Sequence, residues 1–439
     1  MSLKDVYENY KKADYALFSM PGHKNRAAFV LPKEPINADY TELSVTDDLY
    51  ASDGAISRLE DGAAKLFESG YSCLSAGGAS LCVMAAVGLI RNVSKKLLLS
   101  RFCHSSVING MSIFGVEPRF ISQRRGETGY DPVTPADVEK ALAADSEIKA
   151  VFLTSPDYYG GESDVTAIAE ICRERGAVLT VDNAHGTHGI LTGGYPFDAD
   201  IVCDSLHKTL PALTGSAVLN VSKRDVLLFP KEKAKSIMSR LSTTSPSYLL
   251  LYSAERALEW MKGEGREAYI KTAARVKTLK DDIKRLGFTV SETASDGRLV
   301  ISALEKGLSG KELSDALLRD GVVCEMADEN AAVLIITPFN NERDFERLLS
   351  SLQKIDAKAP VAPVTGLIHI PEMVLPLSFP EGNKTETVPV ASAAGKIAAE
   401  NVYIYPPSRP VVLTGERIDE ETVNTLFAAG KKNITVFAP

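Results

Sequence analysis

The sequence predicts an α/β fold in which a mainly parallel, seven-stranded sheet forms the core of the largest domain. Short apolar segments rich in β-branched residues alternate with helical patterns between residues 56 and 265, as in sheets that helices cover on both faces. Thr154, Asp182 and Asp204 fall at the ends of these segments, where parallel sheets bind their ligands. A chain of 439 residues has room for this domain and one or two smaller ones.

Residues 1–55 are expected to form an N-terminal arm that begins with a helix over 3–13. The segment 14–50 has breakers at Pro21-Gly22 and from Pro32 to Pro35 and shows few helical periods, so we expect it to be extended. Such a segment is poorly suited to fold on a core of its own, and we expect it to wrap around a partner subunit.

Residues 56–265 are expected to form the large domain. Its strands are predicted over residues 71–74, 96–100, 118–122, 150–154, 177–182, 200–204 and 216–221. Its helices are predicted over residues 79–92, 104–114, 135–143 and 163–175. Strands that alternate with helices in this order favour a parallel sheet.

Two smaller regions are expected downstream, a small α/β domain over 266–356 and a C-terminal α+β domain over 357–439. A long helix over 248–285, broken at 263–265, leads into the first of them. Short strands are predicted at Thr289 and over 299–301, 322–325 and 332–336, around a helix over 310–318. The Ala/Pro-rich segment 357–363 is expected to be a linker, and helices are predicted over 391–400 and 419–430.

Composition excludes several classes of protein. The formal net charge of -8 argues against a nucleic-acid partner, because such proteins carry basic patches. The longest apolar run, 81–90, is far shorter than the ~18 residues of a membrane helix, and no secretory signal opens the chain. The six cysteines form no C-x-x-C pair and have no histidine at metal-binding spacing, which predicts a reducing cytoplasm and no metal site.

The run from Asp204 to Pro211 carries the strongest chemical signal. Lys208 follows Ser205-Leu206-His207, about one strand and one loop after Asp182. This order and spacing are typical of enzymes that use pyridoxal 5'-phosphate (PLP). The amine of Lys208 can form a Schiff base with the cofactor aldehyde, Ser205 and His207 can bind the phosphate, and Asp182 can keep the pyridine nitrogen protonated.

Two further segments suit the same cofactor. Gly78-Ala79-Ser80 stands between a strand and a helix, where free N–H groups could bind a phosphate; an ordinary glycine-rich helix start is the alternative. His104 could stack on a cofactor ring, or simply lie beside a helix N-cap. Asp182 could itself be an N-cap, and with His185 and His188 it has the composition of a metal site, although further ligands are missing.

With these residues identified, the chain resembles the bacterial ornithine/lysine/arginine decarboxylases, PLP enzymes of the aspartate-aminotransferase fold, in their short form without a wing domain. The similarity runs in order through nearly the whole chain. The matching segments are Met20–Lys24, Asp47–Tyr50, Ser75–Ser80, Cys103–Ser106, Val181–Gly189, Ser205–Thr214, Thr244–Tyr248, Tyr405–Pro407 and Gly415–Glu416.

The resemblance implies a role for each candidate residue. Lys208 would carry the cofactor, Asp182 would pair with its ring nitrogen and His104 would stack on the ring. Gly78, Ala79, Ser80, Ser205 and His207 would bind the phosphate, His185 would lie beside the cofactor and Glu416 would contact the substrate. The family also implies a homodimer, or an assembly of dimers, with the active site at the subunit interface.

The expected reaction is decarboxylation of a basic L-amino acid to an amine that serves polyamine biosynthesis. Asn183, Ser105 and Ser408-Arg409 depart from the family pattern and leave the choice among arginine, lysine and ornithine open. Two alternatives remain. An aminotransferase or lyase could use the same fold, and an inactive PLP-binding subunit could regulate a partner.

Overall fold

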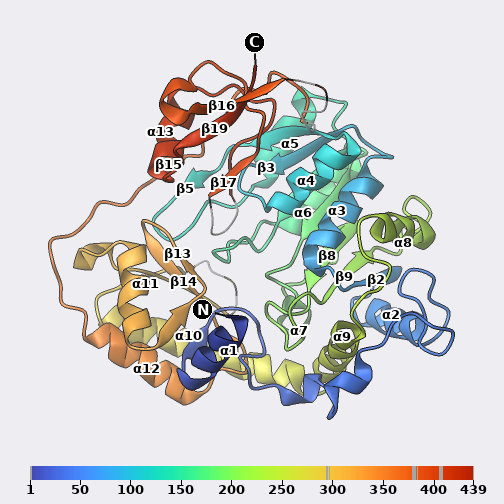
Figure 1. The fold of residues 1–439 in the computed structure, drawn as a ribbon, viewed down its shortest axis with the longest axis horizontal. Coiled ribbons are helices and arrows are strands. Elements are labelled where there is room, and N and C mark those ends of the chain that lie inside the picture. The colour runs from blue at the N-terminus through green and yellow to red at the C-terminus, as the bar shows by residue number, and fades with distance from the viewer. Residues whose placement is uncertain are drawn as a thin grey trace.

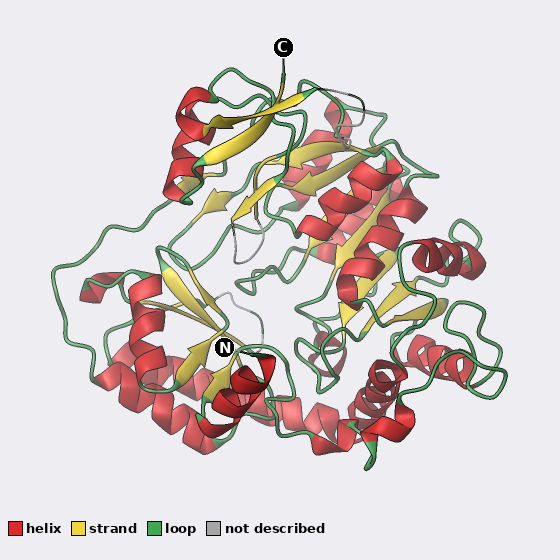
Figure 2. Ribbon diagram, viewed as in Figure 1, coloured by secondary structure: helices red, strands yellow, loops and turns green. Residues whose placement is uncertain are grey.

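The large sheet supplies the framework of the molecule (Figures 1 and 2). The computed structural model describes residues 2–292, 295, 297–377, 382, 384–404 and 409–438. The sheet has seven strands in the order β2-β9-β8-β7-β6-β3-β4. The strands are β2 (Tyr71–Ser75), β3 (Lys96–Ser100), β4 (Glu117–Ile121), β6 (Ala150–Thr154), β7 (Val178–Asp182), β8 (Ile201–Ser205) and β9 (Ala217–Val221).

The predicted, mainly parallel sheet is confirmed. Strands β4, β3, β6, β7 and β8 pair in parallel, whereas β9 runs antiparallel to both β2 and β8. Successive side chains point to opposite faces of a sheet, so each strand feeds two apolar layers. Leu98 and Val151 belong to one buried cluster, and Leu97 and Phe152 belong to the other.

Helices cover both faces of this sheet (Figure 2). The predicted helices are α3 (Gly78–Ile90), α4 (Ser105–Phe114), α5 (Pro135–Ala144) and α6 (Val165–Glu174). Helix α3 is buried on almost every side, which explains its nearly continuous apolar sequence. The sequence did not reveal α2 (Ala55–Leu66), α7 (Gly189–Thr192) or α8 (Lys231–Arg240).

A long helical segment leads from the large domain into the small one. Helix α9 (Tyr248–Trp260) continues through a π-helical turn, Met261–Gly265, into α10 (Arg266–Arg285). The predicted break at 263–265 is therefore a widened turn, because both flanking residues keep helical backbone angles. Tyr269 of α10 is buried and reaches back toward the large domain.

The small domain is an antiparallel sheet backed by helices. Its strand order is β10-β11-β14-β13, and its core includes Leu299, Leu313 and Leu348. The elements are β10 (Thr289–Val290), β11 (Arg298–Ser302), α11 (Gly310–Arg319), β12 (Val322–Cys324), β13 (Met326–Ala327), β14 (Ala331–Ile335) and α12 (Glu342–Gln353). Helix α12 was not predicted.

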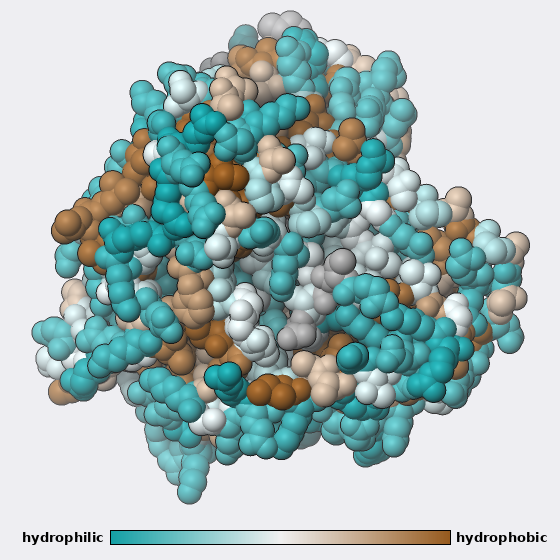
Figure 3. Space-filling model, turned by 180° about the vertical axis from the view of Figure 1, so that it is seen from behind, coloured by the Kyte–Doolittle hydropathy of each residue, from teal (hydrophilic) through white to brown (hydrophobic). Residues whose placement is uncertain are grey.

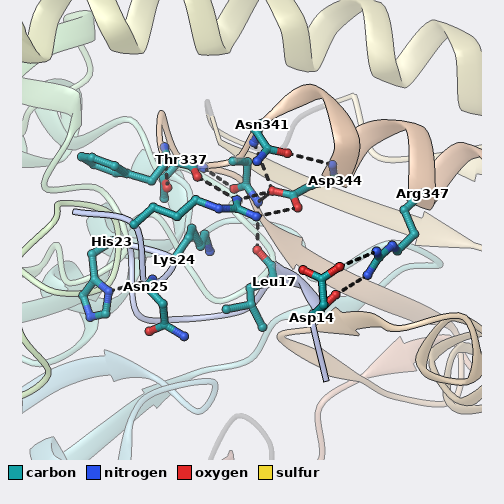
Figure 4. A network of polar contacts seen from close by, with 12 residues as sticks. Asp14, Leu17, His23, Lys24, Asn25, Thr337, Asn341, Asp344 and Arg347 are labelled. Carbon is teal, nitrogen blue, oxygen red and sulfur yellow. Dashed lines mark hydrogen bonds and ion pairs between the residues drawn. The ribbon is translucent and has the colours of Figure 1, made fainter. Parts of the chain in front are cut away.

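The N-terminal arm packs on its own subunit between residues 16 and 26, which corrects the expectation that it lacks a core. After α1 (Leu3–Lys12), strand β1 (Ala16–Phe18) pairs in parallel with β12. Asp344 at the start of α12, labelled in Figure 4, forms an ion pair with Arg26, whose Nη2 lies 2.9 Å from Oδ1. Phe18 is fully buried in the core of the small domain, so this part of the arm completes the domain.

The C-terminal region has an apolar core of its own around Val412, Leu426 and Val436. Its elements are β15 (Gly366–Leu367), which pairs with β5 (Arg124–Arg125), then β16 (Thr385–Pro389), β17 (Val402–Ile404), β18 (Arg409–Val412), α13 (Glu420–Ala428) and β19 (Asn433–Phe437). Short 3-10 turns span Ala28–Val30, Pro35–Ala38, Leu304–Lys306 and Val390–Ser392.

The predicted helix over 391–400 is wrong. Beyond the 3-10 turn at Val390–Ser392, the amide of Gly395 donates to the carbonyl of Ile418 at 2.7 Å. The amide of Ala398 donates in the same way to Glu416 at 2.9 Å. Neighbouring chain segments thus take the backbone hydrogen bonds that a helix would need, and they override the local preference of an alanine-rich sequence.

The described ranges contain no helix that is both long and apolar enough to cross a membrane. The face opposite to that of Figure 1 is mainly hydrophilic, and its hydrophobic residues lie in separate patches (Figure 3).

Candidate active site

One pocket lies at the carboxyl ends of the parallel strands β6, β7 and β8. Thr154 and Asp182 are the last residues of β6 and β7, and Lys208 lies in the loop after β8. The N-termini of α3 and α4 close the opposite side. The residues that line the pocket are Gly78, Ala79, Ser80, Val83, Phe102, Cys103, His104, Ser106, Thr154, Tyr158, Asp182, Ala184, His185, His207 and Lys208.

Lys208 reaches the pocket with its amine beside an imidazole. Its Nζ lies 3.0 Å from Nε2 of His185. Burial lowers the pKa of Lys208 below its usual range, and the positive charge of Arg298 adds to this effect, although Asp182 and Glu325 oppose it. A lysine whose pKa is lowered is more often the neutral amine, which is the nucleophilic form.

The loop that carries Lys208 is held from two sides. The amide of Gly22 in the arm donates to the carbonyl of His207 at 2.7 Å, and the hydroxyl of Tyr269 donates to the carbonyl of Thr209. A Cβ at Gly22 would lie 2.4 Å from the Leu210 carbonyl oxygen. The arm and the loop therefore approach as closely as glycine allows.

Asp182 supplies a buried carboxylate at the end of β7. It is only 6% exposed, and its Oδ1 accepts the amide hydrogen of Ala184 at 3.2 Å. An ionised carboxylate in such a place requires a cationic or hydrogen-bonding partner. Because Asp182 also lines the pocket, a protonated pyridine nitrogen of PLP fits this position.

The start of helix α3 lines the same pocket with backbone amides that could bind an anion. Gly78 adopts a φ of +68°, which favours glycine, and its amide donates to the Gly215 carbonyl at 2.7 Å. The following amides of Ala79 and Ser80 belong to the first turn of the helix, which has no partners within the helix for them. The positive end of the helix dipole adds to their attraction for a phosphate.

Of the two phosphate ligands predicted at the end of β8 and in the loop after it, His207 lines the pocket and Ser205 does not. The Oγ of Ser205 is 3.1 Å from Nδ1 of His207, and Ser205 is fully buried. Burial lowers the pKa of His207 to about 4, so its ring is neutral near pH 7. Ser205 therefore contacts the side of the His207 ring that faces away from the pocket.

His104 caps helix α4 and also lines the pocket. It can therefore be a helix cap and a candidate to stack on the cofactor ring at the same time. Its Nδ1 accepts the amide hydrogen of Ser106 at 3.2 Å, which fixes the ring orientation. Burial lowers the pKa of His104. A neutral ring held in this way is suited to stack on a flat cofactor.

His188 does not join Lys208 in the pocket. It stacks on Tyr269 with the ring centroids 5.0 Å apart. Within the ranges that the structure describes, no three His, Cys, Asp or Glu side chains are grouped to hold a metal ion.

The structure does not place Glu416 in this pocket, contrary to the prediction of a substrate contact. Its carboxylate is fully buried and receives two hydrogen bonds from Arg101, at 2.6 and 2.8 Å, and one from the Leu413 amide at 2.7 Å. These donors occupy both oxygens, so the pair connects the C-terminal region to the large domain. The motif residues Tyr405–Pro407 and Ser408 lie outside the described residues.

The departure from the family pattern at Asn183 lies behind the pocket. The Asn183 side chain donates to Oδ1 of Asp204 at 2.7 Å. Tyr195 and Asn220 donate to Oδ2 of the same carboxylate at 2.7 and 2.9 Å. Asn183 therefore supports the strand that precedes Lys208 and does not contact the pocket directly.

Three residues near the pocket, Tyr158, Arg298 and Glu325, were not predicted from the sequence. Tyr158 lines the pocket, and its hydroxyl donates to Glu325 at 2.5 Å. Arg298 of β11 hydrogen-bonds to Nδ1 of His185. A single arginine in an otherwise apolar strand is a signal that could have identified Arg298. Tyr158, in the loop after β6, and Glu325, in the small domain, gave no comparable local signal.

Comparisons with known proteins identify the family of the chain. The model of the "Orn/Lys/Arg decarboxylase, major domain" matches residues 3–303, and that of the family's C-terminal domain matches residues 381–434. The chain is 28% identical to an arginine decarboxylase of Bacillus subtilis over 93% of this chain and 89% of the relative. It is 27% identical to one of Bacillus anthracis over 98% and 92%.

Solved structures show the same fold. The constitutive lysine decarboxylase of E. coli aligns with a TM-score of 0.75 at 16% identity, over 99% of this chain and 81% of that one. Lysine decarboxylase A of Pseudomonas aeruginosa aligns with a TM-score of 0.74 at 16% identity, over 98% and 77%. The family match covers more than half of the chain and includes every residue that lines the pocket. The chain therefore belongs to the Orn/Lys/Arg decarboxylase family, the PLP-dependent amino-acid decarboxylases that its motifs resemble.

Proposed function

We propose that this protein decarboxylates a basic L-amino acid, with arginine the first candidate, then lysine and ornithine. The observation that carries the proposal is the convergence of Lys208, Asp182, His104 and the start of α3 on one pocket. Arginine comes first because relatives named arginine decarboxylase align over nearly the whole chain. A polyamine-related role and a cytoplasmic location are part of the proposal.

The described residues suit PLP. Bound there, the cofactor would supply an electron sink for the electron pair that remains on the α-carbon when the carboxylate leaves. Asp182 would keep a proton on the ring nitrogen, the amides of Ala79 and Ser80 would bind the phosphate, and His104 would cover the ring. The amine of Lys208 would hold the cofactor through its aldehyde carbon.

The protein's own groups also prepare the substrate's reaction. Apolar and aromatic side chains such as Val83 and Phe102 line the pocket, and they limit the access of water to the reacting carbon. The pocket-lining Tyr158 is held by Glu325, so its ring has a fixed position beside His185, with centroids 4.7 Å apart. These contacts favour one orientation of a bound amino acid.

A product assay tests the proposal against its rivals. The PLP-loaded protein is incubated separately with carboxyl-labelled L-arginine, L-lysine and L-ornithine, with D-arginine as the control. Release of labelled carbon dioxide with an equal amount of the matching amine supports the decarboxylase. A keto acid without carbon dioxide would identify an aminotransferase, and no product from any of the three would favour the inactive regulatory subunit.

We further propose that the working enzyme is a homodimer or an assembly of dimers. The second half of the arm supports this, because Ile36, Leu43 and Val45 are 78%, 55% and 86% exposed in the single chain, and an apolar segment of this kind favours contact with another subunit. Light scattering on the active protein tests it. A fully active species with the mass of one 47.3 kDa chain would contradict the proposal.

A further inference from the structure

Arg298 and Lys208 contact the two nitrogens of one imidazole ring. A guanidinium nitrogen of Arg298 hydrogen-bonds to Nδ1 of His185, and Nε2 of the same ring lies 3.0 Å from Nζ of Lys208. Arg298 comes from strand β11 of the small domain, His185 from the turn after β7, and Lys208 from the loop after β8. Arg298 and His185 are only 1% and 5% exposed, so their contact is buried, whereas Lys208 lines the pocket.

The chemistry of the guanidinium determines where the proton of His185 lies. Arginine carries N–H donors on every side, has no acceptor and stays charged at any ordinary pH. Nδ1 of His185 must therefore offer a lone pair to Arg298. A neutral imidazole has one N–H, which then has to be on Nε2, the nitrogen that faces Lys208. Burial, with Lys208 and Arg298 nearby, lowers the pKa of His185 well below its usual range, which favours the neutral ring.

This tautomer in turn selects a protonation state of Lys208. An ammonium group has three donors and no lone pair, so it cannot accept the N–H of Nε2. The neutral amine has the lone pair that the contact requires. The geometry thus suits the nucleophilic form of the lysine, which is the form that can attack an aldehyde carbon.

Two other donor atoms of Arg298 show that its burial is costly. Its Nε and Nη1 atoms are buried and have no hydrogen-bond partner among the described residues. Native proteins rarely leave buried polar groups unpaired, and such groups call for an explanation. A role in fixing His185 would explain why a guanidinium occupies this position at such a cost.

We propose that Arg298 is a positioning residue that fixes His185 in the Nε2–H tautomer and thereby holds Lys208 as a free amine. The inference rests on the proposed function only in taking Lys208 as the lysine that holds PLP. The tautomer itself is a property of the protein before the cofactor binds, and it can be measured independently of turnover.

Other charged and titratable groups face this chain of contacts and belong in any account of its pH dependence. Those near His185 are His104 and His207, and those near Lys208 are Asp182 and Glu325. Those near Arg298 are Glu325, Tyr158, Asp157 and Tyr269.

The direct test is nitrogen NMR of the full-length protein, labelled with ¹⁵N in its histidine rings and freed of PLP. The chain has six histidines, so the spectrum is simple, and the signal that disappears in His185→Gln assigns the ring. We expect Nε2 of His185 to carry the proton, and Nδ1 to carry none, from pH 6 to pH 9. A wild-type ring protonated at Nδ1, or at both nitrogens near pH 7, would overturn the proposal without the need for any further variant.

Two variants test the part played by Arg298. In Arg298→Met we expect His185 to populate both neutral tautomers. We also expect the pH at which Lys208 is half-modified by an amine reagent to rise by roughly one unit, because a nearby positive charge is lost. The control is Asp157→Asn, which removes a charge beside Arg298 but keeps Oδ1, the acceptor of the Tyr159 and Gly161 amides. It should leave the tautomer unchanged.

If His185 keeps only the Nε2–H tautomer in a folded Arg298→Met protein, the proposal is contradicted. It is also contradicted if His185 loses that tautomer in Asp157→Asn. If Arg298→Met does not fold, the wild-type spectrum still decides the tautomer. The NMR measurement does not involve substrate. An unexpected tautomer would therefore not contradict the proposed decarboxylase activity, and a lack of decarboxylation would not contradict the proposed tautomer.

Discussion

The backbone amide of Gly22 donates a hydrogen bond to the carbonyl oxygen of His207 at 2.7 Å. The N-terminal arm thus contacts the residue next to Lys208. The carbonyl of Gly22 accepts in turn from the hydroxyl of Thr337 in the small domain at 2.7 Å. One glycine therefore links the small domain to the loop that carries Lys208.

Gly22→Ala should disturb this link. The added Cβ would lie within 3 Å of the backbone of Thr209 and Leu210, so the lysine loop has to move. We expect a loss of roughly 1–3 kcal/mol in the free energy of unfolding, the usual cost of overpacking, together with weaker PLP binding. Gly194→Ala is the control, because a Cβ there meets nothing within 4 Å. Equal unfolding midpoints for the two variants would refute the steric argument.

Lys208→Ala should abolish covalent attachment of PLP. We expect the wild-type protein to be yellow and to lose its visible absorbance band on treatment with borohydride, with the reduced adduct on the peptide that contains Lys208. Mass spectrometry of the digested protein identifies the site. A Lys208→Ala protein that still carries a cofactor fixed by borohydride would show that another lysine is used.

Asp182→Asn should keep the fold and some bound PLP but lose most of the turnover. Without the carboxylate the ring nitrogen is less often protonated, so the electron sink weakens. The removal of one electrostatic group of this kind costs roughly 3–4 kcal/mol, or ~100–1,000-fold in kcat. Steady-state kinetics at saturating PLP measures the effect, and near-normal kcat would contradict the role proposed for Asp182.

Glu416→Gln should strongly lower the free energy of unfolding. Glu416 and Arg101 form a buried pair whose side chains are 1% and 0% exposed, and leaving a buried charge unpaired costs roughly 3–5 kcal/mol. Denaturant unfolding measures this loss. Glu267→Gln, which breaks the exposed pair with Lys271, is the matched control and should leave the midpoint unchanged. A stable Glu416→Gln protein with a raised KM would instead restore Glu416 as a substrate contact.

Lys24 should make stability depend on pH. Burial lowers its pKa from 10.5 to about 7 in the folded chain. Between these values the unfolded chain binds more protons at this site, so the contribution of Lys24 to stability rises with pH. The difference in unfolding free energy between wild type and Lys24→Met should change in favour of wild type by up to roughly 1.4 kcal/mol per pH unit above pH 7. Below pH 6 it should be constant. If the difference in unfolding free energy between wild type and Lys24→Met does not vary from pH 6 to pH 9, the lowered pKa of Lys24 is excluded.

The parallel strands and the residues at their ends could be predicted because their signals are local. Each strand is a short apolar run; Asp182 ends one of them, and Lys208 lies three residues after the end of another. The arm and the segment 391–400 could not be predicted in the same way. Strand β1 forms only because β12 lies beside it, and the amides of Gly395 and Ala398 find partners in Ile418 and Glu416. Arg298 and Glu325 reach the site through the docking of the small domain, which no local pattern records.

The π-helical turn at Met261–Gly265 has a mechanical consequence. It joins α9 on the large domain to α10 of the small domain without a flexible hinge, and α10 carries Tyr269, which holds the carbonyl of Thr209. A small change of bend at this turn would move Tyr269 and pull on the residue that follows Lys208. The hydrogen bond from Tyr269 to the Thr209 carbonyl thus couples the geometry of the Lys208 loop to the bend between α9 and α10.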